Sequence, residues 1–160
     1  MQKKTKERID RKFQNLELHQ IDASIFIELF LENRKNYEKC SDYINTLGYK
    51  YRGSISIPAL GEICYTIITK IKDSKKKEDA FRLLYEKIER HEIDFYSPKK
   101  EDYDLAKEMI ISDTILESAD ALRLAETKGN KAKKFITLDG DLVKNKVLQK
   151  NYNIKIELPS

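Results

Sequence analysis

Four acidic residues, far apart in the sequence, each stand beside a segment whose pattern predicts a strand or a helix. Asp22 ends the run LELHQID, which is typical of a short strand, and Asp139 ends the strand predicted in KFITL. Glu62 lies in the first turns of the helix that follows the β-branched run SISI. Because the carboxyl ends of parallel strands meet at one edge of a sheet, we expect these three side chains to lie close together. Asp120, near the start of a helix in SADAL, could approach the same edge.

A cluster of carboxylates at one sheet edge has a restricted chemistry. Carboxylates within a few ångströms of one another repel, and each raises the pKa of its neighbour. A divalent cation removes this conflict, and Mg²⁺ binds oxygen ligands while keeping several of its waters. Such ions can generate hydroxide from water, orient a phosphodiester and stabilise its leaving oxygen. The four carboxylates therefore predict a site for one or two divalent ions.

Each acid also has an ordinary structural interpretation. Asp22 could cap the helix that follows it. Glu62 lies opposite the apolar stripe of its helix and could be a solvated residue near the helix N-terminus, and Asp120 could have the same role in its own helix. Asp139 and Asp141 could form an Asp-Gly turn followed by an aspartate helix cap, with Asp141 as the cap. Taken together, however, these interpretations require four separate coincidences in one fold.

Composition restricts the kind of protein and the kind of metal. The 160 residues suit one compact domain, of which 40% are hydrophobic and 36% are charged, with a formal net charge of +4. The apolar runs are too short to span a bilayer and the N-terminus has no apolar signal region, so we expect a cytoplasmic protein without membrane contact. Cys40, Cys64, His19 and His91 form no zinc-binding pattern, which leaves carboxylates and a hard ion.

Strand and helix patterns alternate through most of the chain. Strands are predicted at 16–22, 54–57, 93–97, 133–138 and 152–158, and helices at 23–33, 58–71, 79–90, 99–110, 118–129 and 142–151. A charged turn is expected at 72–79, and a helical piece followed by a glycine-containing loop at 34–53. The helix over 58–71 carries the apolar stripe Leu60, Ile63, Cys64, Ile67, Ile68 and Ile71. The alternation predicts an α/β fold, a three-layer α/β/α sandwich with a mainly parallel central sheet.

The order of these motifs resembles that of PIN-domain ribonucleases, a family that includes VapC-type toxins and RNA-processing nucleases. IDASIFIEL is similar to the family's opening strand, with Asp22 and a small hydroxyl residue, Ser24, two positions later. SISIPALGEI is similar to the second strand and the helix that bears the family's glutamate, here Glu62. SADALRLAET is similar to the segment with the third acid, Asp120.

The C-terminal motif completes the resemblance, which covers about residues 16–158. FITLDGDL is similar to the family's Thr-x-Asp element at a strand end, here Thr137 and Asp139, with Asp141 as an auxiliary acid. The resemblance implies an endoribonuclease that depends on Mg²⁺ or Mn²⁺, with residues 1–14 as a basic N-terminal extension and 15–160 as a single PIN-like nuclease domain. The ligands it implies are Asp22, Glu62, Asp120, Asp139 and the auxiliary Asp141, with Ser24 and Thr137 orienting carboxylates through hydrogen bonds. The partners it implies are an RNA substrate, a second copy in a homodimer, and an antitoxin protein in the toxin branch.

Some features lie outside the minimal family pattern. The segment 34–53 is longer than in compact toxin members and could form a lid, a dimer contact or an RNA surface. Asp113, one heptad before Asp120, is expected to be a solvated or capping residue. The candidate RNA contacts are the basic residues Lys75, Lys76, Lys77, Lys131, Lys133 and Lys134 and the tyrosines Tyr49, Tyr51 and Tyr103.

Two other functions fit the same residues less fully. One is a catalytically inactive PIN-like domain used for binding or assembly, which the presence of all four acids argues against. The other is a different Mg²⁺-dependent α/β phosphoesterase that acts on small phosphate esters. No glycine-rich phosphate loop occurs in the sequence to support nucleotide hydrolysis.

Overall fold

A five-stranded sheet runs through the centre of the computed structural model, which describes residues 13–31 and 34–160. The strands are β1 (Leu18–Ile21), β2 (Arg52–Ser56), β3 (Asp94–Tyr96), β4 (Lys134–Ile136) and β5 (Lys155–Glu157). Their order is β3-β2-β1-β4-β5, and each neighbouring pair is parallel. The predicted parallel sheet is confirmed, and β1, which ends at the residue before Asp22, lies at its centre.

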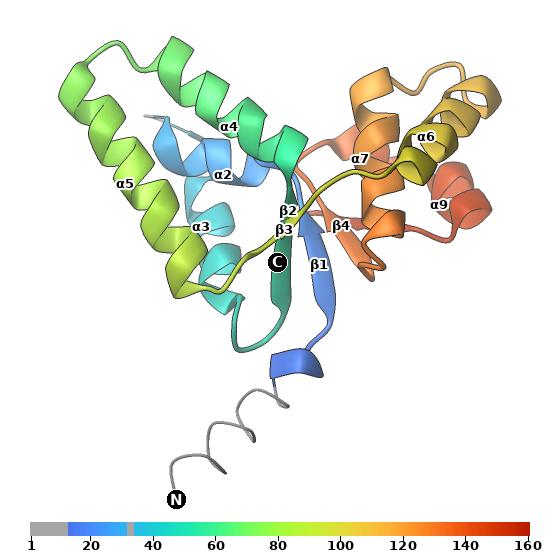
Figure 1. Ribbon diagram of the computed structural model, residues 1–160, viewed down its shortest axis with the longest axis horizontal. Helices are drawn as coiled ribbons and strands as arrows, with labels where there is room; N and C mark the ends of the chain where they lie inside the picture. The colour runs from blue at the N-terminus through green and yellow to red at the C-terminus, as the bar shows by residue number, and fades with distance from the viewer. Residues whose placement is uncertain (1–12, 32–33) are drawn as a thin grey trace, which may run out of the picture.

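Helices cover both faces of the sheet, as Figure 1 shows. On one face lie α2 (Ala23–Phe30), α3 (Tyr37–Thr46), α4 (Ile57–Lys70) and α5 (Ser74–Arg90). On the other lie α6 (Lys100–Ser112), α7 (Ser118–Gly129), α8 (Gly140–Lys144) and α9 (Lys146–Tyr152). This is the predicted three-layer α/β/α sandwich. Among the described helices, none is long and apolar enough to cross a membrane.

Two hydrophobic cores fill the spaces between the sheet and the two helical layers. Ile136 of β4 belongs to the core under α2–α5, whereas its neighbour Phe135 belongs to the core under α6–α9. This alternation is expected of a strand that is buried on both faces. The predicted basic extension, residues 1–14, falls outside the described residues except for its last two.

Local capping corrects two of the predicted boundaries. Ser56 ends β2 and its hydroxyl accepts a hydrogen bond from the Ala59 amide at 3.4 Å, so Ile57 begins α4 instead of extending the strand. Asp73 caps α5 by accepting from the Lys76 amide at 2.8 Å, so most of the charged turn expected at 72–79 is helical. Within α4, Ile68 is 54% exposed, so the buried face of this helix is narrower than the predicted apolar stripe.

The C-terminal helix predicted at 142–151 is two short helices. They meet at Asn145, whose side chain accepts from the Leu148 amide at 3.0 Å and caps α9. The 34–53 segment contains α3 and a turn closed by a bridge between Leu47 and Tyr51, with Gly48 at a φ of 86°. That left-handed backbone conformation favours glycine at the turn.

Candidate functional site

Asp22 lies at the centre of the carboxyl edge of the sheet and is 4% exposed. Its backbone amide donates to the Ile136 carbonyl at 2.9 Å, which extends the β1–β4 pairing by one residue. Although Asp22 precedes α2, its side chain makes no capping hydrogen bond within the described chain. The capping interpretation of Asp22 is therefore wrong, and another interaction directs this carboxylate.

Two hydroxyl groups hold one oxygen of Asp22. The Ser24 hydroxyl donates to Asp22 Oδ2 at 2.6 Å, and the Thr137 hydroxyl donates to the same atom at 2.8 Å. Each hydroxyl also accepts a backbone N–H, from Leu138 at 3.2 Å and from Asp139 at 3.1 Å respectively. Because the amides occupy the acceptor side, both hydroxyl protons are directed at Asp22, and the carboxylate is held in one orientation.

The other oxygen of Asp22 is buried and makes no hydrogen bond among the described residues. Asp22 Oδ1 lies 3.5 Å from Nη1 of Arg123, an ion-pair distance. A buried carboxylate oxygen without a donor is unfavourable unless a cation compensates it. Among the described residues, the cation that compensates this oxygen is Arg123, and a metal ion is the other kind of cation that could do so.

Arg123, on α7, joins three of the four predicted acids. Its Nη1 lies 3.4 Å from Asp120 Oδ1, one helical turn before it, and its Nη2 donates to Glu62 Oε2 on α4. Glu62 and Asp120 thus reach the same place as Asp22, from opposite helical layers. Sequence reasoning missed Arg123, although its position three residues after Asp120 is a spacing at which helical side chains meet.

The electrostatics of the cluster follow from burial and from this arginine. Burial raises the pKa of Asp120, and the charges of Asp139 and Asp22 raise it further, while Arg123 opposes them. Burial alone would lower the pKa of Arg123, but the surrounding carboxylates outweigh this and raise it. Like charges therefore crowd this edge, and one guanidinium compensates part of their repulsion.

Asp139, which follows the end of β4, has a structural role. Its Oδ1 accepts from the amides of Asp141 and Leu142 at 2.8 and 3.1 Å, so Asp139 caps α8. The prediction that Asp141 could be the cap is wrong, because Asp141 already lies within the first turn. Asp120, Asp139 and Asp141 line one cavity of about 320 Å³. The acids thus form two groups, one around Arg123 and one in this cavity, and Asp120 belongs to both.

As they stand, these acids do not form a closed metal cage. Within residues 13–31 and 34–160, no group of three His, Cys, Asp or Glu side chains is placed to hold a metal ion. The donor atoms nevertheless suit a hard cation, since they are all carboxylate oxygens. Arg123 contacts three of the four acids, and the fourth, Asp139, is held by the two amides that donate to it at the start of α8.

The candidate RNA contacts are scattered. Lys133 and Lys134 lie at the amino end of β4, away from the acids, and Lys134 pairs with Glu157 at 2.9 Å. Lys75–Lys77 lie in the first turn of α5 and not in the predicted turn. Asp113 is the capping residue that follows the last residue of α6, as expected, and its side chain accepts a hydrogen bond from the Asn145 side-chain amide at 3.0 Å.

The tyrosines and the remaining lysine also lie apart from one another. Tyr51 stacks on His19 with ring centroids 4.2 Å apart, which gives it a packing role. Tyr49 and Tyr103 are exposed, and Lys131 occupies a turn with a φ of 57°. None of these placements by itself makes an RNA surface.

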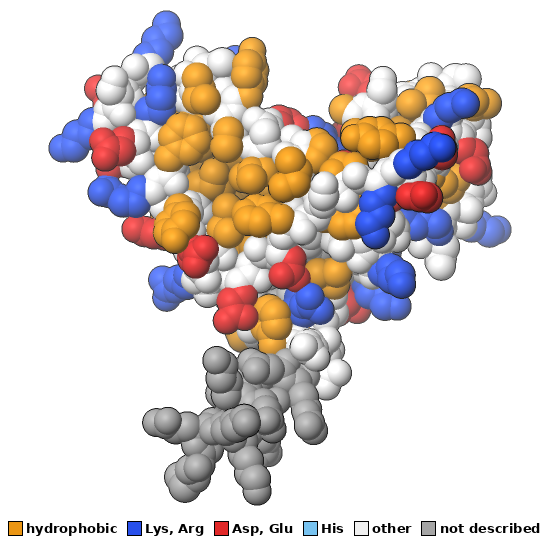
Figure 2. All heavy atoms as spheres, in the orientation of Figure 1, with side chains coloured by type: hydrophobic (Ala, Val, Ile, Leu, Met, Phe, Trp, Pro, Cys, Tyr) orange, Lys and Arg blue, Asp and Glu red, His pale blue; other side chains and the backbone are white. Residues whose placement is uncertain are grey.

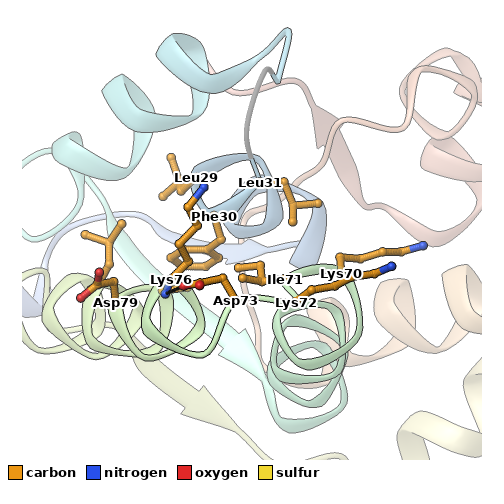
Figure 3. Close-up of a pocket in the computed structure, with 11 residues that line it drawn as sticks. Leu29, Phe30, Leu31, Lys70, Ile71, Lys72, Asp73, Lys76 and Asp79 are labelled. Carbon is orange, nitrogen blue, oxygen red and sulfur yellow. Dashed lines mark hydrogen bonds between the residues drawn. The ribbon is translucent and has the colours of Figure 1, made fainter.

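A larger cavity of about 540 Å³ lies where α2 meets α4 and α5 (Figure 3). Leu29, Phe30 and Ile71 supply apolar lining, and lysines of α4 and α5 stand at its rim. As far as the described residues go, its lining includes none of the four predicted acids. Its size alone does not connect it with the carboxylate chemistry.

Comparison with known proteins identifies the architecture. The model of the PIN domain family matches residues 20–148. The structure of VapBC2 from Rickettsia felis, solved bound to a promoter DNA fragment, is similar to this chain. It is 15% identical with a TM-score of 0.63, over 89% of this chain and 99% of that one. VapC20 of Mycobacterium tuberculosis, described as a sarcin–ricin loop cleaving toxin, is 14% identical with a TM-score of 0.59, over 77% and 91%.

FitAcB from Neisseria gonorrhoeae is similar as well, at 12% identity and a TM-score of 0.60, over 88% of this chain and 97% of that one. At such identities the likeness establishes the fold. No curated protein matches the sequence significantly.

Proposed function

The chain belongs to the PIN domain family, and we propose that it is a metal-dependent endoribonuclease that hydrolyses RNA phosphodiester bonds. The observation that carries this proposal is the environment of Asp22. Two hydroxyls fix one oxygen of its carboxylate, while the other oxygen is buried and makes no hydrogen bond among the described residues. A carboxylate held in this way is prepared for a cation.

The proposed ligands of Mg²⁺ or Mn²⁺ are Asp22, Glu62, Asp120 and Asp139, with Asp141 as an auxiliary acid. A bound ion of this kind supplies charge for the phosphate oxygens and lowers the pKa of a bound water. Ser24 and Thr137 orient Asp22, and Asp139 keeps its position because it also caps α8. Asp141 lies exposed at the cavity that Asp120 and Asp139 line, where its carboxylate can accept a hydrogen bond from water.

The proposed partners are an RNA substrate and an antitoxin protein. Among similar solved structures, VapC20 is described as a sarcin–ricin loop cleaving toxin, and this description supports RNA as the substrate class. The antitoxin follows from the resemblance to VapC-type toxins and would be a separate chain. The lysines at 75–77 and 131–134 are proposed as phosphate contacts, although they lie apart from one another on α5 and around the start of β4.

A homodimer is proposed through an apolar face of the molecule. Figure 2 shows hydrophobic side chains gathered on the face where Figure 1 places α4, α5 and β3. The exposed large side chains on these elements are Ile57, Tyr65, Ile68, Tyr85 and Phe95. Apolar surface of this kind commonly marks an interface. Sedimentation analysis should give a dimer that Ile68→Lys weakens, and a wild-type monomer at all concentrations would contradict this part of the proposal.

One observation favours a second function, that of an inactive PIN-like binding domain. Arg123 already compensates three of the four acids, as it would in a protein that never takes up metal. The two functions differ in their response to Mn²⁺. A metal site predicts that Mn²⁺ raises the melting temperature of the wild type and not that of a variant with all four acids neutralised, whereas an inactive domain predicts no response in either.

Cleavage of a mixed pool of structured and single-stranded RNAs tests the proposed activity. The wild type should cut with Mn²⁺ and stop when a chelator is added. Asp22→Asn and Asp139→Asn should both lose most of this activity. Asp79→Asn is the matched control, because Asp79 is an exposed aspartate on α5 that pairs with Arg82 three residues later, as Asp120 does with Arg123. Cleavage that survives chelation, or normal cutting by both site variants, would exclude the mechanism.

A further inference from the structure

Arg123 reaches across the sheet edge to acids that come from three different elements. Its side chain extends from α7 and forms ion pairs with Asp120 on its own helix, with Asp22 after the end of β1, and with Glu62 of α4. In Figure 1, α7 and α4 lie on opposite sides of the sheet, so this side chain links the two helical layers above the strand ends. Its side chain is 21% exposed.

The contacts of Arg123 are of unequal quality. Nη1 lies 3.5 Å from Asp22 and 3.4 Å from Asp120, longer than a good N–H···O bond, and this one nitrogen is shared between the two carboxylates. Neither aspartate therefore receives the paired hydrogen bonds that make arginine–carboxylate contacts strong. The contact with Glu62 is close, but the Glu62 side chain is 41% exposed and can move with its partner. The arginine is thus close enough to neutralise the two aspartates, but its hydrogen bonding to them is weak.

The negative charge of the surrounding carboxylates explains why a cationic side chain lies at this position. Three carboxylates surround the position, and two of them are substantially buried, so their mutual repulsion is screened little by solvent. One guanidinium offsets part of that repulsion in the metal-free protein. The same positive charge opposes a second cation at the same oxygens, since two cations at one set of carboxylates repel each other.

We propose that Arg123 is the resident counter-ion of the metal-free site and that it competes with the divalent ion for Asp22, Glu62 and Asp120. In the metal-free protein it holds the two helical layers together above the strand ends. It must turn away from Asp22 Oδ1 before that oxygen can become a ligand, so Arg123 sets the metal affinity of the site. This inference rests on the proposed metal-dependent function and assigns to that site a regulating residue.

Mn²⁺ binding, measured by calorimetry on the intact chain without RNA, tests this competition. Arg123→Met keeps most of the length and packing of the side chain and removes the charge. Its dissociation constant for Mn²⁺ should be lower than that of the wild type by about tenfold or more, the size of effect expected from one partly buried charge. Arg123→Lys keeps the charge and should stay close to the wild type. Arg82→Met is the matched control, because Arg82 pairs with an aspartate at the same helical spacing on an exposed surface.

Thermal unfolding gives a second readout that needs no activity. Without metal, Arg123→Met should melt below the wild type, because the carboxylates lose their counter-ion. Saturating Mn²⁺ should then raise its melting temperature by more than it raises that of the wild type, since binding no longer displaces a cation. Equal Mn²⁺ affinity, or weaker binding by Arg123→Met, would overturn the competition while leaving the metal site intact. If neither protein binds Mn²⁺, the proposed metal function fails and the competition fails with it.

A measurement on the wild type avoids dependence on the stability of the variant. The Nε–Hε resonance of Arg123, assigned by its loss in Arg123→Lys, should move during a titration with Mg²⁺ toward the values of exposed arginines. If metal binds, as other resonances at the site would show, and the Arg123 resonance keeps its position, the proposal is wrong.

Discussion

Thr137→Val should destabilise the protein more than an ordinary buried threonine substitution, because it removes a hydroxyl that serves a charged group. The Thr137 hydroxyl donates to Asp22 Oδ2 at 2.8 Å and accepts from the Asp139 amide at 3.1 Å, and Thr137 is 0% exposed. A hydrogen bond to a charged group contributes about 1.5–3 kcal/mol and a neutral one about 1 kcal/mol. Valine has nearly the same shape, so we expect a loss of about 3 kcal/mol in the free energy of unfolding.

Urea denaturation followed by circular dichroism measures this loss, with Thr127→Val as the matched control. Thr127 is also buried, but its hydroxyl donates to the uncharged Arg123 carbonyl at 2.8 Å, so its replacement should cost about 1 kcal/mol. Thr137→Val should in addition weaken Mn²⁺ binding by about 10-fold to 100-fold, the usual effect of removing a group that orients a ligand. If Thr137→Val costs no more than Thr127→Val, the hydroxyl does not hold a charged carboxylate and the reasoning is refuted.

Three further sets of substitutions test the roles of other residues. Burial raises the pKa of Glu126, while the nearby Ser56 hydroxyl and Arg123 act to lower it, and neither of its buried oxygens makes a well-formed hydrogen bond among the described residues. Ionisation of Glu126 therefore lowers stability as pH rises above the pKa that this side chain has in the unfolded chain. Glu126→Gln should raise the free energy of unfolding at pH 7, and the gain should disappear at about pH 4, where the glutamate is protonated in both states. A pH series of urea titrations measures this. Gly129→Ala should destabilise by about 1–3 kcal/mol in the same titration, because a Cβ would overlap the Asp102 carboxylate, whereas Gly61→Ala meets open space and should stabilise slightly. Asp139→Asn should keep the α8 cap and the stability of the wild type but lose Mn²⁺ binding in calorimetry. Asp139→Ala should lose Mn²⁺ binding and also the cap, which costs about 1 kcal/mol in the free energy of unfolding. If both variants have the same free energy of unfolding, the cap contributes nothing.

The parts of the site that could be predicted from the sequence depend on local pattern. Asp22 and Asp139 each follow a short apolar run, and a parallel sheet brings such strand ends to one edge. The hydrogen bonds from Ser24 and Thr137 to Asp22 also involve residues next to those strand ends. Short apolar runs and their ends are visible in a single sequence because buried strands need them.

The parts that could not be predicted depend on how helices pack over the sheet. Arg123 meets Glu62 across 61 residues of sequence and from the opposite helical layer, and no local pattern reports such a contact. Two aspartates flank one glycine before α8, so the sequence allows Asp141 as the cap, and local preference cannot choose between it and Asp139. Ile68 fits the apolar period of α4, but the helix buries a narrower face than its sequence offers.

Mn²⁺ located by anomalous scattering in crystals of the wild-type protein tests the proposed site most directly. The expected result is a peak beside Asp22 Oδ1, with Asp120 or Asp139 as a further ligand and with Asp22→Asn crystals lacking the peak under the same conditions. A peak that lies elsewhere, or that persists unchanged in Asp22→Asn, would contradict the assignment of these acids as the metal centre.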